Sequence, residues 1–189
     1  MRLDALARLA AWTRSSGWPS VAGMAHVVEA FVVRSGALAA GALGPARVIA
    51  LRQGVSLVPV TRAVLAHAAA AFPAAAGAAA RPADAAGAPP VLFADLPKLD
   101  AAALAWMHSL AGATAPFAYL ETDYDGGRAR QAAAVWRGGA LVYGPRRGNI
   151  GPINEALAHL GVHGVGTSDA FDAVGLGRHR TTEEWFAAR

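Results

Sequence analysis

One stretch of the sequence limits the possible folds more than any other: Ala118–Trp136, AYLETDYDGGRARQAAAVW. Strand-forming residues stand on both sides of Asp125-Gly126-Gly127, and glycine accepts the positive φ that a tight turn requires. A second Gly-Gly pair follows at Gly138-Gly139. The pattern therefore predicts an antiparallel meander of three strands, Phe117–Thr122, Arg130–Arg137 and Ala140–Tyr143.

Further strands and two helices are predicted before the meander. The β-branched and aromatic run HVVEAFVV from His26 favours a strand. A hairpin around Gln53-Gly54 joins Arg47–Leu51 to Val55–Val60, and Pro59 indicates that the second strand ends there or lies at an edge. Other predicted elements are a helix over Arg62–Phe72 capped by Thr61, a short strand at Val91–Leu96, and a helix over Ala101–Leu110 capped by Asp100.

Three helices are predicted after the meander. Pro152 suits the first turn of a helix that runs to Leu160, where Gly161 follows as a stop signal. Ser168 is the expected cap of a helix over Asp169–Val174, and Thr181 with Glu184 has capping-box spacing before a last helix. The fold class that these elements predict is α+β, with a mainly antiparallel sheet and helices packed on one face.

The expected domain organisation is one α+β domain over residues 24–189, preceded by an appendage at 1–23. Residues 73–90, PAAAGAAARPADAAGAPP, lack large apolar side chains and are expected to form a flexible linker within the domain. The appendage contains Leu3, Leu6 and Leu9 at near-helical spacing. Two interpretations stay open for it: an amphipathic helix that docks on the domain, or an extension upstream of a natural start at Met24.

Composition argues against several classes of function. The chain has no cysteine, which excludes disulfides, thiolate metal sites and cysteine nucleophiles. The formal charge of +4 comes mainly from scattered arginines, with Lys98 as the one lysine, so nucleic-acid binding is not expected. Alanine and arginine excess suggests a GC-rich genome. No segment has the length and hydrophobicity of a membrane span, and we expect a cytoplasmic protein without a cofactor.

The first candidate site is the acidic group Glu121, Asp123 and Asp125. Because side chains alternate along a strand, all three carboxylates are expected on one face. They could hold a hard cation or supply an acid–base pair, but a solvated strand face that ends in an acidic turn explains them as well. No metal site is therefore assigned. Gln131, on the return strand, is a further candidate binding residue.

Two basic loops are the other candidate sites. Arg146 and Arg147 lie in Gly144–Pro152, GPRRGNIGP, which is expected to be a loop that could bind a phosphate or carboxylate. Arg178, His179 and Arg180 lie in GLGRHR between two predicted helices, and His179 is the histidine best placed to carry a proton. A further hypothesis is that this loop meets the acidic strand in space and forms ion pairs such as Glu121–Arg178 or Asp123–His179.

The C-terminal half resembles a group of uncharacterised bacterial proteins of actinobacterial type. The resemblance covers about residues 116–186 well and 47–72 loosely. Asp125 stands where the group usually has an aromatic residue, and Ala129 where it usually has glycine. The motifs that carry the resemblance are Glu121, Tyr124, Gly126-Gly127, Gln131, Ala134-Val135-Trp136, Ile153-Asn154, Ala156-Leu157, Leu160-Gly161-Val162, Asp169, Phe171-Asp172, Gly175 through Arg180, Thr182, Glu184 and Trp185.

Three functions remain open from the sequence. The leading hypothesis is a non-enzymatic cytoplasmic binding protein that acts through a protein partner, because the sequence has no recognisable catalytic spacing beside a mixed polar surface. The immunity or accessory type is what the resemblance implies. The second is a small enzyme for an anionic small molecule, with Glu121 or Asp123 as base and the Arg178-His179-Arg180 loop as proton carrier and anion clamp. The third is a subunit of a larger assembly, with residues 1–23 as a docking helix.

Overall fold

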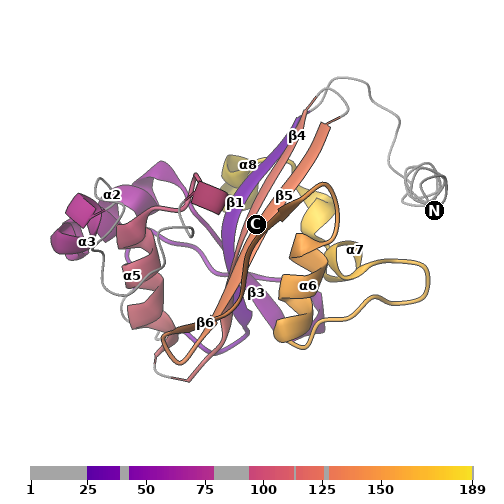
Figure 1. Ribbon diagram of the computed structural model, residues 1–189, viewed down its shortest axis with the longest axis horizontal. Coiled ribbons are helices and arrows are strands. Elements are labelled where there is room, and N and C mark those ends of the chain that lie inside the picture. The colour runs from indigo at the N-terminus through magenta and orange to yellow at the C-terminus, as the bar shows by residue number, and fades with distance from the viewer. Residues whose placement is uncertain (1–24, 39–42, 79–93, 113, 126–127, 189) are drawn as a thin grey trace.

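A six-stranded antiparallel sheet forms the centre of the protein (Figure 1). The computed structural model describes residues 25–38, 43–78, 94–112, 114–125 and 128–188, so the predicted appendage at 1–23 lies outside the described residues. The order of the strands is β2-β3-β1-β4-β5-β6. Their bounds are β1 His26–Arg34, β2 Ile49–Ala50, β3 Val55–Pro59, β4 Phe117–Asp125, β5 Arg128–Arg137 and β6 Ala140–Gly148.

The predicted meander is confirmed as β4, β5 and β6, with longer strands than expected. The β4–β5 ladder continues to the pair Asp125 and Arg128, and β6 runs on to Gly148. The expectation of a loop at Arg146 and Arg147 is therefore wrong: both residues are paired with β5. The pairing of β2 with β3 confirms the first hairpin, and β3 ends at Pro59, as expected for a residue without a backbone donor.

The helices confirm most of the predicted caps. Thr61 accepts a hydrogen bond from the backbone of Val64, and Asp100 accepts two from the first turn of its helix. Ser168 is not a cap, because Asp169 occupies that position one residue later. The helices are α2 Arg62–Ala71, α3 Pro73–Ala78, α5 Ala101–Ala111, α6 Pro152–His159, α7 Ala170–Val174 and α8 Thr182–Ala187, with 3-10 turns η2 at Arg52–Gly54 and η3 at Leu176–Arg178.

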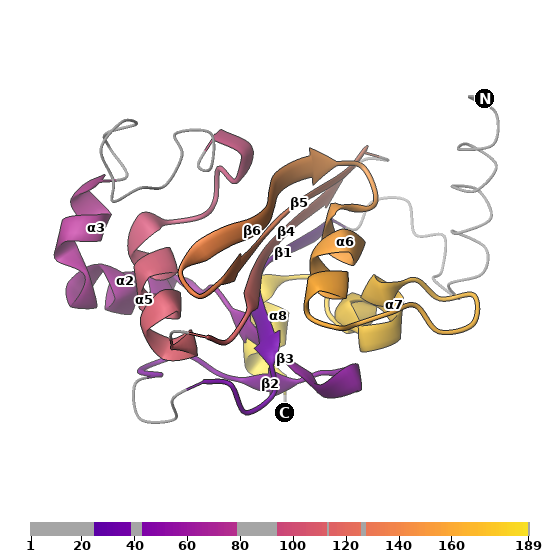
Figure 2. The same ribbon diagram turned by 60° about the horizontal axis from the view of Figure 1, so that its bottom comes forward.

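The α+β class and the antiparallel sheet are confirmed, but the helices cover both faces of the sheet rather than one. Helices α2, α3 and α5 lie on one side, and α6 and α7 lie on the other (Figures 1 and 2). The reason is visible in β4: Phe117 and Tyr119 point to the α5 side, while Ala118 and Leu120 point to the α6 side. A strand that is apolar on both faces must be covered on both.

Two segments differ from the expected loop and strand. Pro73–Ala78, the start of the predicted linker, forms helix α3 and contacts α5, because Ala75 packs against the core on that side. Residues 79–90 lie outside the described residues. Of the strand expected at Val91–Leu96, Ala94 and Asp95 have helical backbone instead. Within the described part of the chain, no helix is long and apolar enough to cross a membrane.

Candidate functional site

A row of paired residues crosses the sheet at the end where β4 approaches its hairpin. Glu121 of β4 pairs with Ala132 of β5, and Ala132 pairs with Arg147 of β6. One step closer to the turn, Asp123 pairs with Arg130. Since directly opposed residues in a sheet project to the same face, all five side chains lie on the α5 side.

A pocket of about 160 Å³ opens over this row. Helix α5 begins at Ala101 and covers the sheet further from the turn, where the side chains are apolar. Beyond it, the methyl group of Ala132 leaves room between the longer side chains on each side. The lining residues are Pro97, Lys98, Glu121, Thr122, Asp123, Arg130, Gln131, Ala132 and Arg147.

Glu121 is the buried carboxylate of the pocket. Its side chain is only 6% exposed, and its Oε1 accepts a hydrogen bond from the backbone N–H of Lys98 at 3.1 Å. Burial raises the pKa of Glu121 above its usual value, and the Lys98 N–H opposes this shift. Burial, with the charges of Glu121 and Glu29, raises the pKa of the neighbouring Tyr119 well above its ordinary value.

The cations of the pocket have different partners. The Lys98 ammonium lies 3.6 Å from a carboxylate oxygen of Glu29, a β1 residue that pairs directly with Glu121. Arg130 and Arg147 are exposed, and neither makes an ion pair with another residue in the described ranges. Both guanidinium-bearing residues border the pocket.

Gln131, a predicted binding residue, lines the pocket and also has a structural role. Its side-chain oxygen accepts hydrogen bonds from Gly151 N at 3.2 Å and Ile153 N at 3.4 Å, which are unpaired donors at the start of α6. Its amide nitrogen donates to the hydroxyl of Tyr124. Both ends of the side chain are thus used to attach α6 to the sheet.

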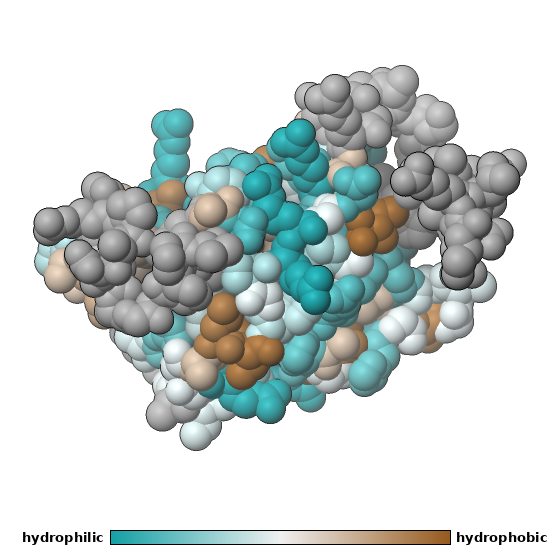
Figure 3. All heavy atoms as spheres, viewed as in Figure 1, coloured by the Kyte–Doolittle hydropathy of each residue, from teal (hydrophilic) through white to brown (hydrophobic). Residues whose placement is uncertain are grey.

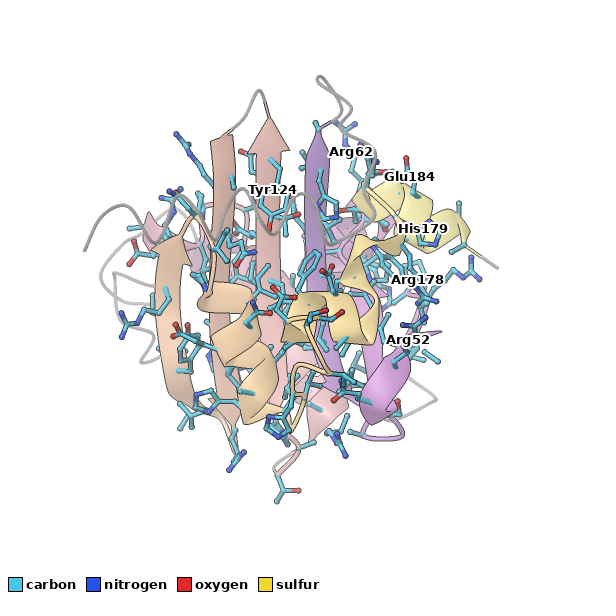
Figure 4. The ribbon with its side chains drawn as sticks, turned by 90° about the vertical axis from the view of Figure 1, so that its right-hand side faces the viewer. Arg52, Arg62, Tyr124, Arg178, His179 and Glu184 are labelled. Atoms are coloured by element: carbon cyan, nitrogen blue, oxygen red, sulfur yellow. The ribbon has the colours of Figure 1, made fainter. Side chains whose placement is uncertain are left out.

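Arg178 and His179 pack on Trp185, on the other side of the sheet from Glu121, while the Arg180 carbonyl accepts a hydrogen bond from Val27 N of β1 at 2.8 Å. The His179 ring meets the Trp185 ring edge-on with 4.7 Å between centroids, and the Arg178 guanidinium lies 5.2 Å from the Trp185 ring. Trp185 is fully buried in the cluster that contains α6 and α7. Figure 4 shows Arg178 and His179 beside Glu184 at the edge of that face.

The structure therefore does not assemble the predicted acid–histidine site. Glu121 projects to the α5 side, whereas His179 packs on the opposite side. Neither of the predicted ion pairs, Glu121–Arg178 and Asp123–His179, is formed among the described residues. The third residue of the loop, Arg180, donates its backbone N–H to Glu184 at 2.7 Å. Local packing and capping thus account for this loop.

His26 is a buried packing residue. It is 2% exposed, its Nδ1 lies 2.9 Å from the Thr122 hydroxyl, and its ring stacks on Tyr124 at 5.3 Å between centroids. Burial lowers the pKa of His26 below its usual value. Burial also raises the pKa of Tyr124 to about 12. This polar group of His26, Thr122 and Tyr124 is on the α6 side.

A second exposed feature follows β6, the edge strand of the sheet. Val142 is 44% exposed, Ile150 is 41% exposed, and Arg146 and Arg147 lie between them in the chain and are exposed as well. We call these four residues the β6 surface. Figure 3 shows the corresponding face: strongly hydrophilic side chains run along its middle, and hydrophobic patches lie on either side.

No group of three or more histidine, aspartate or glutamate side chains among the described residues is placed to hold a metal ion. Comparison of the chain with known protein families, curated proteins and solved structures gave no match. The resemblance to the actinobacterial group therefore stays a prediction.

Sequence reasoning missed five lining residues of the pocket: Pro97, Lys98, Thr122, Arg130 and Ala132. The hairpin itself contained the signal for two of them. Folding the chain about Gly126-Gly127 with Asp125 opposite Arg128 places Arg130 opposite Asp123 and Ala132 opposite Glu121. Lys98 had no such signal, because it comes from a distant loop whose position depends on the packing of α5.

Proposed function

We propose that this chain is a non-enzymatic cytoplasmic binding protein of immunity or accessory type, and that it binds an acidic protein partner through the β6 surface. The observation that supports the proposal is the combination of two exposed arginines with exposed Val142 and Ile150 on one edge of the sheet. Protein interfaces are enriched in arginine, and anchoring apolar side chains at their centre are surrounded by polar groups.

Side chains, rather than an added strand, make the contact in this proposal. An edge strand exposes unpaired backbone groups and invites a second strand, and bulges, proline and charge prevent this. All three occur in β6: its register with β5 shifts near Val135, Pro145 lacks an N–H, and Arg146 and Arg147 follow. The same features disfavour pairing of β6 with a second copy of the chain.

Charge sets the chemistry of the partner. Arg146 and Arg147 present two guanidinium groups that form no ion pair with any described residue. Carboxylates are the protein groups that match guanidinium geometry in paired hydrogen bonds. The partner is therefore a protein surface with aspartate or glutamate side chains next to apolar ones.

The alternatives have less support. The enzyme hypothesis assigned proton transfer to His179, which packs on Trp185 on the opposite side of the sheet from Glu121. It retains only the pocket over Ala132, which has no histidine among its lining residues. The assembly hypothesis relies on residues 1–23, which lie outside the described residues. The immunity or accessory character rests on the resemblance alone.

Site-specific photocrosslinking in the native cells tests the proposal. A photoreactive amino acid replaces Val142 in one variant and Val165, which is 64% exposed in the loop between α6 and α7, in a control variant. We expect one acidic protein to be crosslinked from position 142 and not from position 165. The same product from both positions, or none from position 142, would contradict the proposal.

A further inference from the structure

The pocket over Ala132 has opposite charges on opposite walls. Glu121 and Asp123 come from β4, while Arg147 comes from β6 and Arg130 from β5. Strands β4 and β6 are two strand spacings apart, about 10 Å. Ala132 lies between Glu121 and Arg147 in the row and is 4% exposed, so it forms the floor between the acidic and basic walls.

The net charge of the lining defines the class of ligand. Glu29 neutralises Lys98, with 3.6 Å between the charged atoms. Two carboxylates and two guanidinium groups remain. A purely anionic ligand would meet Asp123 and Glu121, and a purely cationic ligand would meet Arg130 and Arg147. Only a ligand with both charges is complementary to both walls.

We propose that this pocket binds a compact zwitterion of the amino-acid class, with its ammonium group at Glu121 and Asp123 and its carboxylate at Arg147 and Arg130. This site goes beyond the proposed function and shares one residue, Arg147, with the β6 surface. The pocket also contains a fixed hydrogen-bond acceptor: Glu121 is more than nine-tenths buried, and the Lys98 N–H holds its carboxylate in place. Burial strengthens charge–charge contacts relative to water.

Size restricts the ligand further. At about 160 Å³ the pocket is smaller than the roughly 300–1,000 Å³ of sites for drug-sized molecules. A small ω-amino acid is small enough for a pocket of this volume, whereas a nucleotide or an oligosaccharide is too large. The spacing between the two charged walls should select the distance between the ammonium and carboxylate groups of the ligand.

Isothermal titration calorimetry with full-length protein tests the proposal. The probes are glycine, β-alanine, 4-aminobutanoate and 5-aminopentanoate, with acetate and ethylammonium as ligands of single charge. We expect at least one zwitterion to bind at least about tenfold more tightly than either single-charge probe, since each wall contributes a charged contact. No binding of any zwitterion, or equal binding of acetate, would overturn the proposal.

Two variants locate the site on the structure. Ala132→Leu fills the floor, and Arg147→Ala removes one of the two guanidinium groups; each should reduce affinity for the best probe about tenfold or more. Arg146→Ala is the matched control and should leave the affinity unchanged. If Ala132→Leu does not fold, as judged by circular dichroism, Arg147→Ala decides alone. Equal loss in Arg146→Ala and Arg147→Ala would refute the site.

The two proposals can fail independently. Ala132→Leu should reduce the affinity for the probe about tenfold or more and leave photocrosslinking from position 142 intact. A loss of crosslinking with retained probe binding would contradict only the proposed partner surface.

Discussion

Arg146 and Arg147 are neighbours in the chain, yet they lie on opposite faces of β6. Arg147 pairs with Ala132 and lines the pocket on the α5 side. Arg146 pairs with Ala133, which belongs to the α6 side, and its charge lowers the otherwise raised pKa of Tyr143 there. β6 therefore places one arginine on each side of the sheet. Comparing substitutions of Arg147 and Arg146 distinguishes an effect of the pocket from an effect of positive charge in general.

Gln131 is expected to contribute stability rather than binding. Replacing it by Leu would leave the Gly151 and Ile153 backbone donors without their acceptor, at a cost of about 1–3 kcal/mol in the free energy of unfolding. Urea unfolding followed by fluorescence measures this. The control is Arg130→Ala, an exposed neighbour on β5 that should change stability by less than about 0.5 kcal/mol. An unchanged stability of Gln131→Leu would refute the structural role.

Trp185, rather than His179, should be the critical residue of the C-terminal segment. The indole is fully buried in the apolar cluster on the α6 side, so Trp185→Ala should cost about 3–5 kcal/mol. His179→Ala removes only a ring packed on its surface and should cost about 1 kcal/mol or less. Thermal unfolding of both variants tests the order. A larger loss in His179→Ala would show that the loop has another role.

The raised pKa of Glu121 predicts that its carboxyl group lowers the stability of the fold increasingly as the pH rises. A carboxyl group whose pKa is higher in the folded state binds protons more readily there, so its contribution to stability falls as pH rises from about 4.5 through the folded pKa. Glu121→Gln removes this titration and can still accept the Lys98 N–H. The stability of Glu121→Gln relative to wild type should therefore be greater at pH 8 than at pH 4.5. A difference that is constant with pH would contradict the buried carboxylate.

The lowered pKa of His26 predicts the opposite dependence of stability on pH. Its pKa is lowered by burial, so protonation is harder in the folded state, and stability is lost as pH falls from about 6.5 through the folded value. His26→Gln does not titrate. Between pH 8 and pH 5, wild type should lose stability relative to His26→Gln, which denaturant titration at each pH measures. Parallel pH profiles for the two proteins would count against the buried neutral imidazole.

The local elements were predictable because their signals are local. The β4–β5 ladder that closes at Asp125 and Arg128, the caps Thr61 and Asp100, and the stop at Pro59 each depend on a few adjacent residues. The placement of helices on both faces was missed, although the alternation of Phe117, Ala118, Tyr119 and Leu120 in β4 shows two apolar faces. The end of β6 was missed because glycine and proline at 144–145 resemble a loop, while a bulge allows the strand to continue.

The candidate site was predictable only in part. The common face of Glu121 and Asp123 followed from strand alternation, and the structure confirms it. The proposed meeting of Glu121 with His179 did not follow from any local rule, since it required knowing on which side of the sheet the C-terminal segment packs. That side is decided by burial of Trp185, a long-range contact with β1.

The central claim is that the β6 surface binds an acidic protein, and the most direct measurement is the affinity of the crosslinked partner for matched variants. Arg146→Glu and Ile150→Asp should weaken binding at least about tenfold, and raising the salt concentration should weaken wild-type binding. Arg62→Glu, an exposed position on α2, should have little effect. Equal affinity for Arg146→Glu, Ile150→Asp and wild type would contradict the account.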